Sequence, residues 1–516
     1  MSGQAGSNAP QAHWIIKNHA VSDRGCVDGD FAPVIDAILA NRNITSTNER
    51  DAFLDPKLAD LSDPFEIPGM TAAVERIFAA AEQGEVVTLY GDYDVDGVTS
   101  LTLLKTVLDA YGVVCGTFLP HRIGEGYGLS VDGLERCLKE QSPSLIIAVD
   151  CGTTSIDEVH WLQNHGVECV ILDHHEPSPN GLPDCIALVN PKVPEPGKPL
   201  RFDYLCSAGV VFKLAHAMLK RRPVNDFKLR DHLDVVAVGT VADIVPLIEE
   251  NRTLVKSGLR ELARTHSVGL AALAEIAGIN PPYGAQDISF RISPRLNAAG
   301  RLDTAALALD LMLCEDPIAA QQLAVDLDQK NQTRQKLEHE AATSAIDAIE
   351  NGRAGHFDYG IVIASREWHP GVVGIVASRI CRKFHRPTFV IAIDDSGVGK
   401  GSGRSISGIS LVDIINSGRS HLIQGGGHEM AAGISILEEE VEAFRFHLNA
   451  HVRDNNSPED MLPQLHIETE CKLEQLQLEI LDEFLRLEPF GASNPEPILI
   501  ARNVVPTSEP RILKDK

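Results

Sequence analysis

The sequence predicts an α/β protein in which a larger domain with a parallel sheet is followed by a long helix, a smaller α/β domain and the start of a β-rich module. Three observations support this prediction. Short β-branched runs alternate with turns and helical stretches, one helical pattern is unusually long, and a second alternation follows it. Strands that alternate with helices form parallel sheets that are buried on both faces.

The predicted sheet of the larger domain begins at Glu85. The runs EVVTLY, SLIIAVD, VECVILD and LDVVAVG, at 85–90, 144–150, 167–173 and 233–239, are predicted as strands. Acidic or glycine-containing turns end these runs. In open α/β sheets ligands bind beyond the carboxyl ends of the strands, so we expect a functional site where these turns meet.

A single long helix is predicted after this domain. Asp316 is placed to cap it, Pro317 lies in its first turn, and its period continues to about Asn351 and Gly352. At about 1.5 Å per residue such a helix is roughly 50 Å long, which exceeds the usual length in globular proteins. We expect a helix of this length to join two domains.

The length of 516 residues suggests three or four structural units. We expect an N-terminal segment (1–70) that packs on the catalytic domain, the catalytic domain itself (71–315) and the connecting helix (316–352). A substrate-binding domain (353–470) and an incomplete β module (471–516) follow.

The composition limits the classes of function. With 46 basic and 72 acidic residues the net charge is −26, which argues against a protein that coats nucleic acid non-specifically. Any nucleic-acid contact must then be local. Ten cysteines without a CxxC pair argue against a zinc ribbon or a disulfide framework, and no membrane-spanning run or export signal is expected. A cytoplasmic location is therefore predicted.

Acidic and histidine residues recur in the predicted turns: GDYDVDG, Asp150 in AVDCGTTS, Asp173-His174-His175 in ILDHHEP, and Asp243 in GTVADIVPL. If GDYDVDG is extended, Asp92, Asp94 and Asp96 share one face. The alternative for any one of these aspartates is a helix N-cap. Carboxylates that converge need a hard divalent cation such as Mg²⁺ or Mn²⁺, and this number of ligands suits two ions that activate water for phosphoryl displacement.

These four motifs, in this order, resemble those of the DHH phosphoesterase superfamily, and QGGGHEMAAG resembles the glycine-rich motif of its DHHA1 domain. Further segments are similar to signatures of the RecJ family of single-strand-specific exonucleases. They are HRIGEGYGLS, SPRLNAAGRL, DLDQKNQTRQ, WHPGVVGIVASR and LEPFGASNPEP.

The resemblance implies roles for individual residues. Asp150 would bridge two ions, Asp173 would orient the histidine ligand, and His175 would face the phosphate. Many relatives carry a histidine where Tyr90 stands, so the role of this position and the choice among the three aspartates stay open. The implied metal ligands are Asp92, Asp94, Asp96, Asp150, His174 and Asp243.

The resemblance also implies nucleic-acid-binding residues. Arg295 and Arg301 match an arginine-bearing segment, whereas Arg122, Arg291 and Arg334 are equally open to a structural ion-pair role. Gly425 to His428 are interpreted as a loop that offers bare backbone amides to a phosphate. For His369 a core position is the alternative, and Trp368 is interpreted as a packing residue. The implied set is Arg295, Arg301, His369, Arg379, Ser402, Arg404, Gly426, Gly427 and His428.

LEPFGASNPEP resembles the entry to an OB-fold module, a five-stranded barrel that binds single strands. Because only about thirty residues remain from the start of this motif, too few for a barrel at ordinary strand lengths, we expect weaker binding to single strands than in a relative with the whole module.

The leading interpretation is a Mn²⁺- or Mg²⁺-dependent exonuclease that degrades single-stranded DNA from the 5′ end to mononucleotides, in DNA repair and recombination. Its direction and its partners, a single-strand-binding protein and a helicase, come from the resemblance. One alternative is a phosphoesterase for short oligoribonucleotides or cyclic dinucleotides, and another is a non-catalytic replication scaffold.

Overall fold

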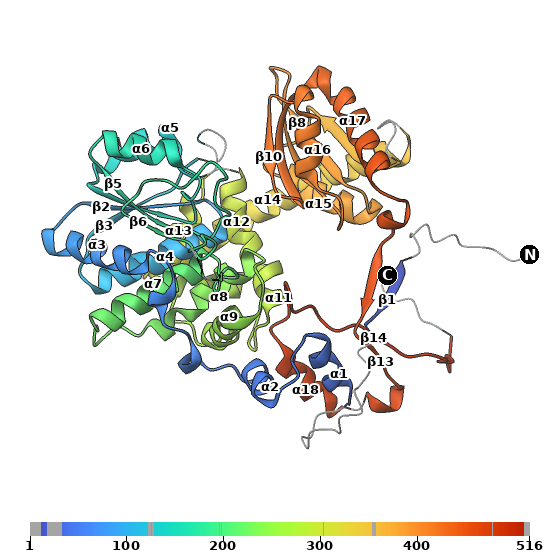
Figure 1. Cartoon of the computed structure of the whole chain (residues 1–516), viewed down its shortest axis with the longest axis horizontal. Coiled ribbons are helices and arrows are strands. Elements are labelled where there is room, and N and C mark those ends of the chain that lie inside the picture. Colours follow the sequence, from blue (N-terminus) through green and yellow to red (C-terminus); the bar gives the residue numbers. More distant parts are fainter. Residues whose placement is uncertain are drawn as a thin grey trace, which may run out of the picture. The chain divides into compact units, whose positions relative to one another are not determined.

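A computed structural model of the chain describes residues 12–17, 33–121, 125, 128–195, 197, 199–302, 304–352, 358–476 and 478–509. It divides into two compact units, one of residues 1–18 and 332–467, the other of 19–331 and 468–516 (Figure 1). Arg122 and the last residues of the C-terminal module lie outside the described residues. None of the described helices combines the length and hydropathy needed to span a bilayer.

The unit of residues 19–331 and 468–516 contains a five-stranded parallel sheet in the order β3-β2-β4-β5-β6, and the predicted fold class is confirmed. Its strands are β2 (Val87–Gly91), β3 (Cys115–Phe118), β4 (Leu145–Val149), β5 (Glu168–Leu172) and β6 (Ala187–Val189). Three of the four predicted runs are among them.

Helices cover both faces of this sheet (Figure 1). Alternate strand residues face opposite cores, as Leu89 and Tyr90 do. One core includes α3 (Met70–Gln83), α4 (Val95–Ala110), α7 (Ser207–Arg221), α8 (Leu233–Ala242) and α9 (Glu249–Leu262). The other includes α5 (Val131–Gln141) and α6 (Ile156–Asn164). Both faces of β2 and β4 are thus buried.

The fourth predicted strand, LDVVAVG, is wrong, because residues 233–242 form the helix α8. Leu233, Val236 and Val238 are almost fully buried, so this helix is mostly apolar and is buried on all sides. A short buried helix and a buried strand have the same hydropathy pattern, and periodicity cannot separate them.

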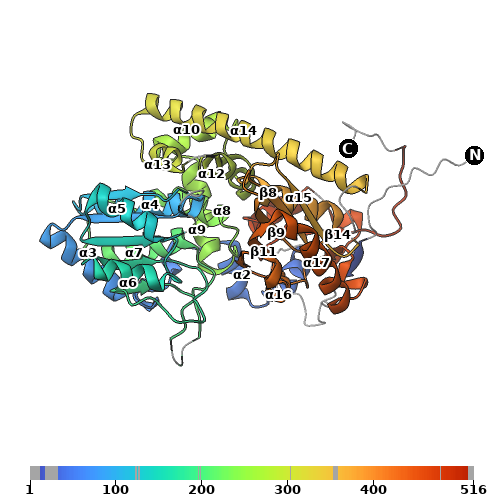
Figure 2. The ribbon, with the colours of Figure 1, turned by 90° about the horizontal axis from the view of Figure 1, so that it is seen from above.

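Further helices complete this unit. After α10 (Val268–Ile276) and α11 (Ala285–Asp287), a π-helical turn at Ile288–Ile292 leads into α12 (Ser293–Leu302) and α13 (Ala306–Met312). The predicted long helix is α14 (Pro317–Glu350), which Figure 2 shows as one continuous element. It begins in this unit and ends in the other.

The unit of residues 1–18 and 332–467 has a mixed sheet in the order β10-β11-β9-β8-β7. Its strands are β7 (Ile361–Ser365), β8 (Thr388–Ile393), β9 (Val398–Arg404), β10 (Gln424–Gly427) and β11 (Ala431–Leu437). The end of α14 and α15 (Val373–Phe384) pack on one face, and α16 (Leu411–Ser417) and α17 (Val441–Asn455) on the other.

The chain ends are distributed between the units. β1 (His13–Ile16) pairs with β12 (Gln464–Ile467), whereas α1 (Pro33–Asn41) and α2 (Thr47–Leu54) share a core with α18 (Ile480–Leu487). The described strands of the C-terminal module are β13 (Thr469–Glu470) and β14 (Leu499–Ile500). The five-part division drawn from the sequence stays a prediction.

Candidate metal centre and substrate-binding residues

The three aspartates of GDYDVDG do not lie on one extended segment, which corrects the prediction. Asp92 directly follows β2, Asp94 is the N-cap of α4, and Asp96 lies in the first helical turn. The Asp94 carboxylate accepts a hydrogen bond from the amide of Gly97 at 3.1 Å. A side chain at Gly97 would stand 2.4 Å from the carbonyl oxygen of Asp92, so only glycine permits this tight strand-to-helix turn.

Asp243 reaches the same place from α8, at whose C-cap it lies. One turn earlier, an added Cβ at Gly239 would stand 2.4 Å from the Thr99 hydroxyl and 3.1 Å from an oxygen of Asp96. Gly239 therefore permits α8 to approach α4 closely. The prediction that Asp243 follows a strand is wrong, yet its carboxylate joins the others.

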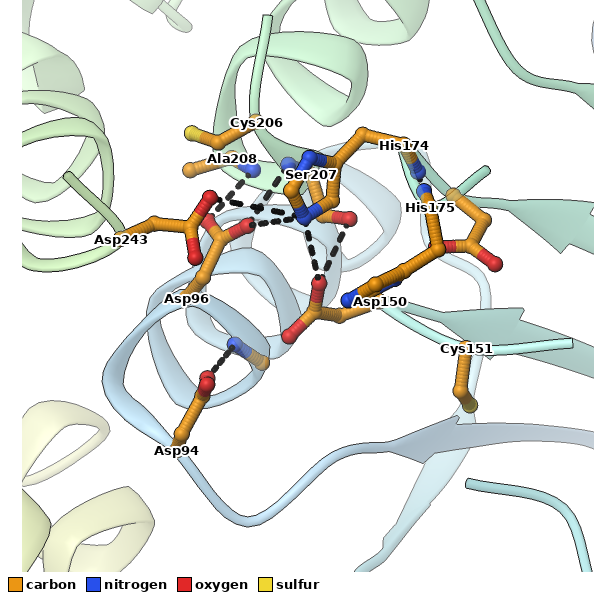
Figure 3. Close-up of polar contacts among 12 residues, drawn as sticks. Asp94, Asp96, Asp150, Cys151, His174, His175, Cys206, Ser207, Ala208 and Asp243 are labelled. Atoms are coloured by element: carbon orange, nitrogen blue, oxygen red, sulfur yellow. Dashed lines mark hydrogen bonds and ion pairs between the residues drawn. The ribbon is translucent and has the colours of Figure 1, made fainter. Parts of the chain in front are cut away.

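The structure brings together all six predicted metal ligands. His174 Nε2 lies 3.5 Å from Asp150 Oδ1, 3.5 Å from Asp243 Oδ2 and 3.8 Å from Asp96 Oδ2 (Figure 3). Three sets of ligand atoms lie within 4.8 Å of one another. They are Asp92, Asp94 and Asp150; Asp96, His174 and Asp243; and Asp150, His174 and His175. Asp150 is common to two of these sets.

Burial and mutual repulsion disfavour ionisation of these carboxyl groups. Burial and the charges of Asp96 and Asp94 raise the pKa of Asp150 well above its ordinary value. The same effects raise the pKa of Asp243 to about 8, and burial with the charge of Asp94 raises that of Asp96 to about 6. A cation within the cluster would remove this penalty.

His174 has the properties of a ligand. Burial and the neighbouring His175 lower its pKa to about 3, so the ring is neutral. Both ring nitrogens are buried and have no hydrogen-bond partner among the described residues. Buried polar atoms of this kind are rare in folded proteins. A neutral imidazole surrounded by carboxylates fits a divalent cation such as Mn²⁺.

Asp173 forms hydrogen bonds with both histidines. Its Oδ1 accepts hydrogen bonds from the His174 amide at 2.7 Å and from Nδ1 of His175 at 2.7 Å, and its Oδ2 accepts from the Thr153 amide at 2.9 Å. Asp173 therefore bonds the ring of His175 and the backbone of His174. Burial opposes a charge on His175, but the hydrogen bond and charge of Asp173 raise its pKa to about 9.

Tyr90 does not point into the cluster. It is fully buried in the core formed with α5 and α6, stacks on Phe118 with ring centroids 5.0 Å apart, and donates a hydrogen bond from its hydroxyl to the carbonyl of Gly128 at 3.2 Å. Tyr90 thus has a packing role in this structure.

Sequence reasoning missed Ser207, at the start of α7. Its amide and that of Ala208 donate to the two oxygens of Asp96, at 2.7 Å and 2.9 Å, and its hydroxyl lies 2.9 Å from Asp150 Oδ1 (Figure 3). The available signal was the short run CSAG directly before an apolar helical pattern, which is typical of a helix start.

Two of the predicted substrate-binding arginines lie on α12. The Arg295 guanidinium is mostly buried, pairs with Asp328 at 2.8 Å and donates to the carbonyl of Arg291 at 2.7 Å. Arg301 lies in the last turn of α12 and is partly buried. Next to it, an added Cβ at Gly300 would stand 2.8 Å from the Tyr93 carbonyl, so this turn lies beside the GDYDVDG segment.

The other predicted residues lie in the unit of residues 1–18 and 332–467. An added Cβ at Gly374 would stand 3.3 Å from Ser402 Oγ and 3.4 Å from Arg404 Nη2, so β9 and the start of α15 bring these polar groups together. His369 is partly exposed, and its Nδ1 accepts the Gly371 amide at 3.0 Å. Arg379 is exposed, and Trp368 is buried among apolar residues.

The glycine-rich motif is a strand, which corrects the interpretation as a loop. Gly426 and Gly427 belong to β10, which forms an edge of the sheet and pairs with β11. The amide of His428 donates to the Ala431 carbonyl at 2.8 Å and is not bare. Both glycines and His428 are exposed. Arg334, which was open to a structural role, pairs with Glu338 at 2.8 Å.

Comparison with known proteins places this architecture in a family. Residues 86–240 match the DHH family N-terminal domain, residues 358–454 the DHHA1 domain, and residues 467–516 the RecJ OB domain. The chain is 38% identical over 92% of its length to the single-stranded-DNA-specific exonuclease RecJ of Bacillus subtilis, of which it spans 59%. It is 36% identical to that of Haemophilus influenzae, with 90% of this chain and 82% of that protein covered.

Comparison with solved structures leads to the same family as the sequence comparisons. The crystal structure of RecJ from Thermus thermophilus in complex with Mn²⁺ aligns with a TM-score of 0.79 at 32% identity, over 91% of this chain and 66% of that one. A manganese-bound exonuclease RecJ aligns with a TM-score of 0.65 at 36% identity, over 76% of this chain and 96% of that one. This chain therefore belongs to the RecJ family of DHH proteins.

Proposed function

We propose that this protein is a metal-dependent exonuclease that degrades single-stranded DNA in the 5′ to 3′ direction to mononucleotides, in DNA repair and recombination. The observation that carries the proposal is the buried cluster of carboxylates around the neutral, unbonded ring of His174. Relatives named as single-stranded-DNA-specific exonucleases support the substrate.

We propose that Asp92, Asp94, Asp96, Asp150, His174 and Asp243 hold two Mn²⁺ or Mg²⁺ ions, with Asp150 shared between them. When bound, such ions lower the pKa of a coordinated water and offset the charge that develops on a phosphate. The protein supplies the donor geometry. Four of the six, Asp92, Asp96, Asp150 and His174, are buried, and the ligand atoms form sets that lie within 4.8 Å of one another, so the donor set would need little rearrangement to hold the ions.

Further residues act on the substrate in this proposal. His175 would donate a hydrogen bond to a phosphate oxygen, and its contact with Asp173, which raises its pKa to about 9, supports a charged ring in this role. Arg295, Arg301, Arg379, Arg404, Ser402, His369 and the Gly426–His428 segment would bind the DNA backbone. A bidentate arginine is well suited to phosphate, and exposed glycines allow close approach of a strand.

The proposed partners follow from the substrate. An exonuclease restricted to single strands needs an enzyme that unwinds duplex DNA, so a helicase is proposed as a partner. A single-strand-binding protein, which would hold the separated strands, is proposed as a second partner. The proposed compartment is the cytoplasm. Stimulation of duplex digestion by a helicase would test this partner.

Digestion of labelled strands tests substrate, direction and metal together. Single strands labelled at the 5′ or at the 3′ end are incubated with the protein, with and without Mn²⁺, beside a labelled short RNA. A 5′ label should appear at once as mononucleotide, whereas a 3′ label should pass through shortened strands. Preferential cleavage of the short RNA would support the alternative substrate class.

Asp150→Ala should abolish this digestion, because it removes the carboxylate common to two ligand sets. Its circular dichroism spectrum should match that of the wild type. Digestion in Mn²⁺ at the wild-type rate would refute the assignment.

A further inference from the structure

Ser207 lies between two acidic motifs that are far apart in the sequence. Its backbone amide donates to Asp96, which belongs to the motif after β2, and its hydroxyl donates to Asp150, which follows β4. The residue is fully buried. One residue of α7 therefore contacts two carboxylates of the cluster, Asp96 and Asp150, that come from different motifs.

The hydroxyl acts on the carboxylate that the ligand sets share. Asp150 Oδ1, which accepts the Ser207 hydroxyl at 2.9 Å, also lies 3.5 Å from His174 Nε2. A carboxylate common to two ions must hold both oxygens in a fixed orientation, and hydrogen bonds from neighbouring residues fix such orientations. The N-cap of α7 is Cys206, so the Ser207 hydroxyl is not needed to cap its own helix.

We propose that Ser207 is a positioning residue that fixes the Asp150 carboxylate and thereby sets the affinity of the cluster for divalent cations. This inference rests on the proposed function. It concerns the hydroxyl alone, because the backbone amide that binds Asp96 is present whatever the side chain at position 207.

Calorimetric titration of Mn²⁺ into the metal-free full chain tests the proposal without depending on activity. Two pairs of variants isolate the hydroxyl: the wild type against Ser207→Ala, and Ser207→Thr against Ser207→Val, in which the two side chains have nearly the same shape. Ser100→Ala is the matched control, since Ser100 is equally buried and its hydroxyl has no hydrogen-bond partner within the described part of the chain.

Loss of the hydroxyl should weaken Mn²⁺ binding about 10- to 100-fold, the usual effect of removing a residue that orients a metal ligand. Ser207→Thr should bind more tightly than Ser207→Val by a similar factor, and Ser100→Ala should bind like the wild type. If Ser207→Ala folds poorly, the comparison of Ser207→Thr with Ser207→Val still tests the role of the hydroxyl, because these two variants add the same bulk and differ only in the hydroxyl.

Equal Mn²⁺ affinities within both pairs would overturn the inference while leaving DNA digestion by the wild type intact. Conversely, a wild type that binds Mn²⁺ but digests none of the labelled strands would refute the proposed function. In that case the calorimetric comparison still decides the role of Ser207.

Discussion

Asp243 shows at the scale of one residue how the cluster couples ion binding to protons. Burial and the charges of Asp96 and Asp94 raise its pKa from an ordinary 3.8 to about 8 in the folded protein without metal. Between about pH 4 and pH 8 the folded state therefore keeps a proton that the unfolded chain has released. The contribution of Asp243 to the stability of the metal-free protein therefore falls as the pH rises through this window.

A bound cation replaces that proton, so stabilisation by Mn²⁺ should grow as the pH rises from 6 to 8. Thermal unfolding with saturating Mn²⁺ and with chelator, at pH 6, 7 and 8, measures the difference in unfolding temperature. Asp243→Asn should reduce the pH dependence of that difference. A Mn²⁺ effect that is constant over this range would contradict the prediction.

The sequence predicted which residues form the cluster better than how they reach it. Asp92, Asp150 and His174 do follow parallel strands, whose carboxyl ends meet at one edge. Asp94 and Asp96 instead belong to the start of a helix, and Asp243 to the end of one. The run before Asp243 was predicted as a strand because a short apolar run carries no period that separates a helix from a strand. Ser207 was not predicted because its partners become neighbours only in the folded chain.

At the scale of elements, α9 fastens the C-terminal segment to the larger domain. The Arg252 guanidinium is almost fully buried and donates to four carbonyls, those of Phe53, Arg486, Leu487 and Glu488, at 2.7–3.0 Å. One turn further along α9, Lys256 donates to the carbonyls of Leu54 and Arg486. The ends of α2 and α18 are thereby held by backbone contacts.

Arg252→Met should lower the free energy of unfolding by about 1–3 kcal/mol, because it leaves buried carbonyls without a donor. Chemical denaturation of the full chain measures this change. Arg260→Met is the control, because Arg260 is exposed on the same helix and its loss should have little effect. Equal destabilisation by both substitutions would argue against the role given to Arg252.

The glycine-rich motif was misread at the same scale. A run of three glycines predicted a loop, but its pairing with β11 supplies the stabilisation that side chains would otherwise give. Strand pairing between residues is not visible in local composition, which is why glycine-rich strands are hard to predict. The long helix α14 was predicted nearly to its ends because its period is sustained over many turns.

At the scale of the whole molecule, the charge of −26 argues against a general electrostatic attraction to DNA. Binding must then depend on a few cationic side chains. Arg404, beside Ser402 on β9, is one candidate. Each arginine that contacts a phosphate of a single strand adds about 0.7 to the slope of log affinity against log salt concentration.

Arg404→Met should therefore reduce the salt slope of single-strand binding by about 0.7 and weaken binding for every sequence alike. Fluorescence anisotropy of a labelled oligonucleotide across a salt series, with a chelator to prevent digestion, gives the slope. Arg453→Met is the control, since Arg453 belongs to α17 on the opposite face of the sheet. An unchanged slope for Arg404→Met would remove this arginine from the interface.

The contacts of Arg252 also bear on which substitutions the chain tolerates. Because this arginine binds main-chain oxygens, the attachment of α18 does not depend on the side chains at positions 486 and 488. These two positions are therefore open to change in natural or designed variants. Position 252, in contrast, needs a side chain with several N–H donors in one plane, as arginine has. The Arg252 guanidinium would then keep its hydrogen bonds to the end of α18 while the side chains at positions 486 and 488 vary.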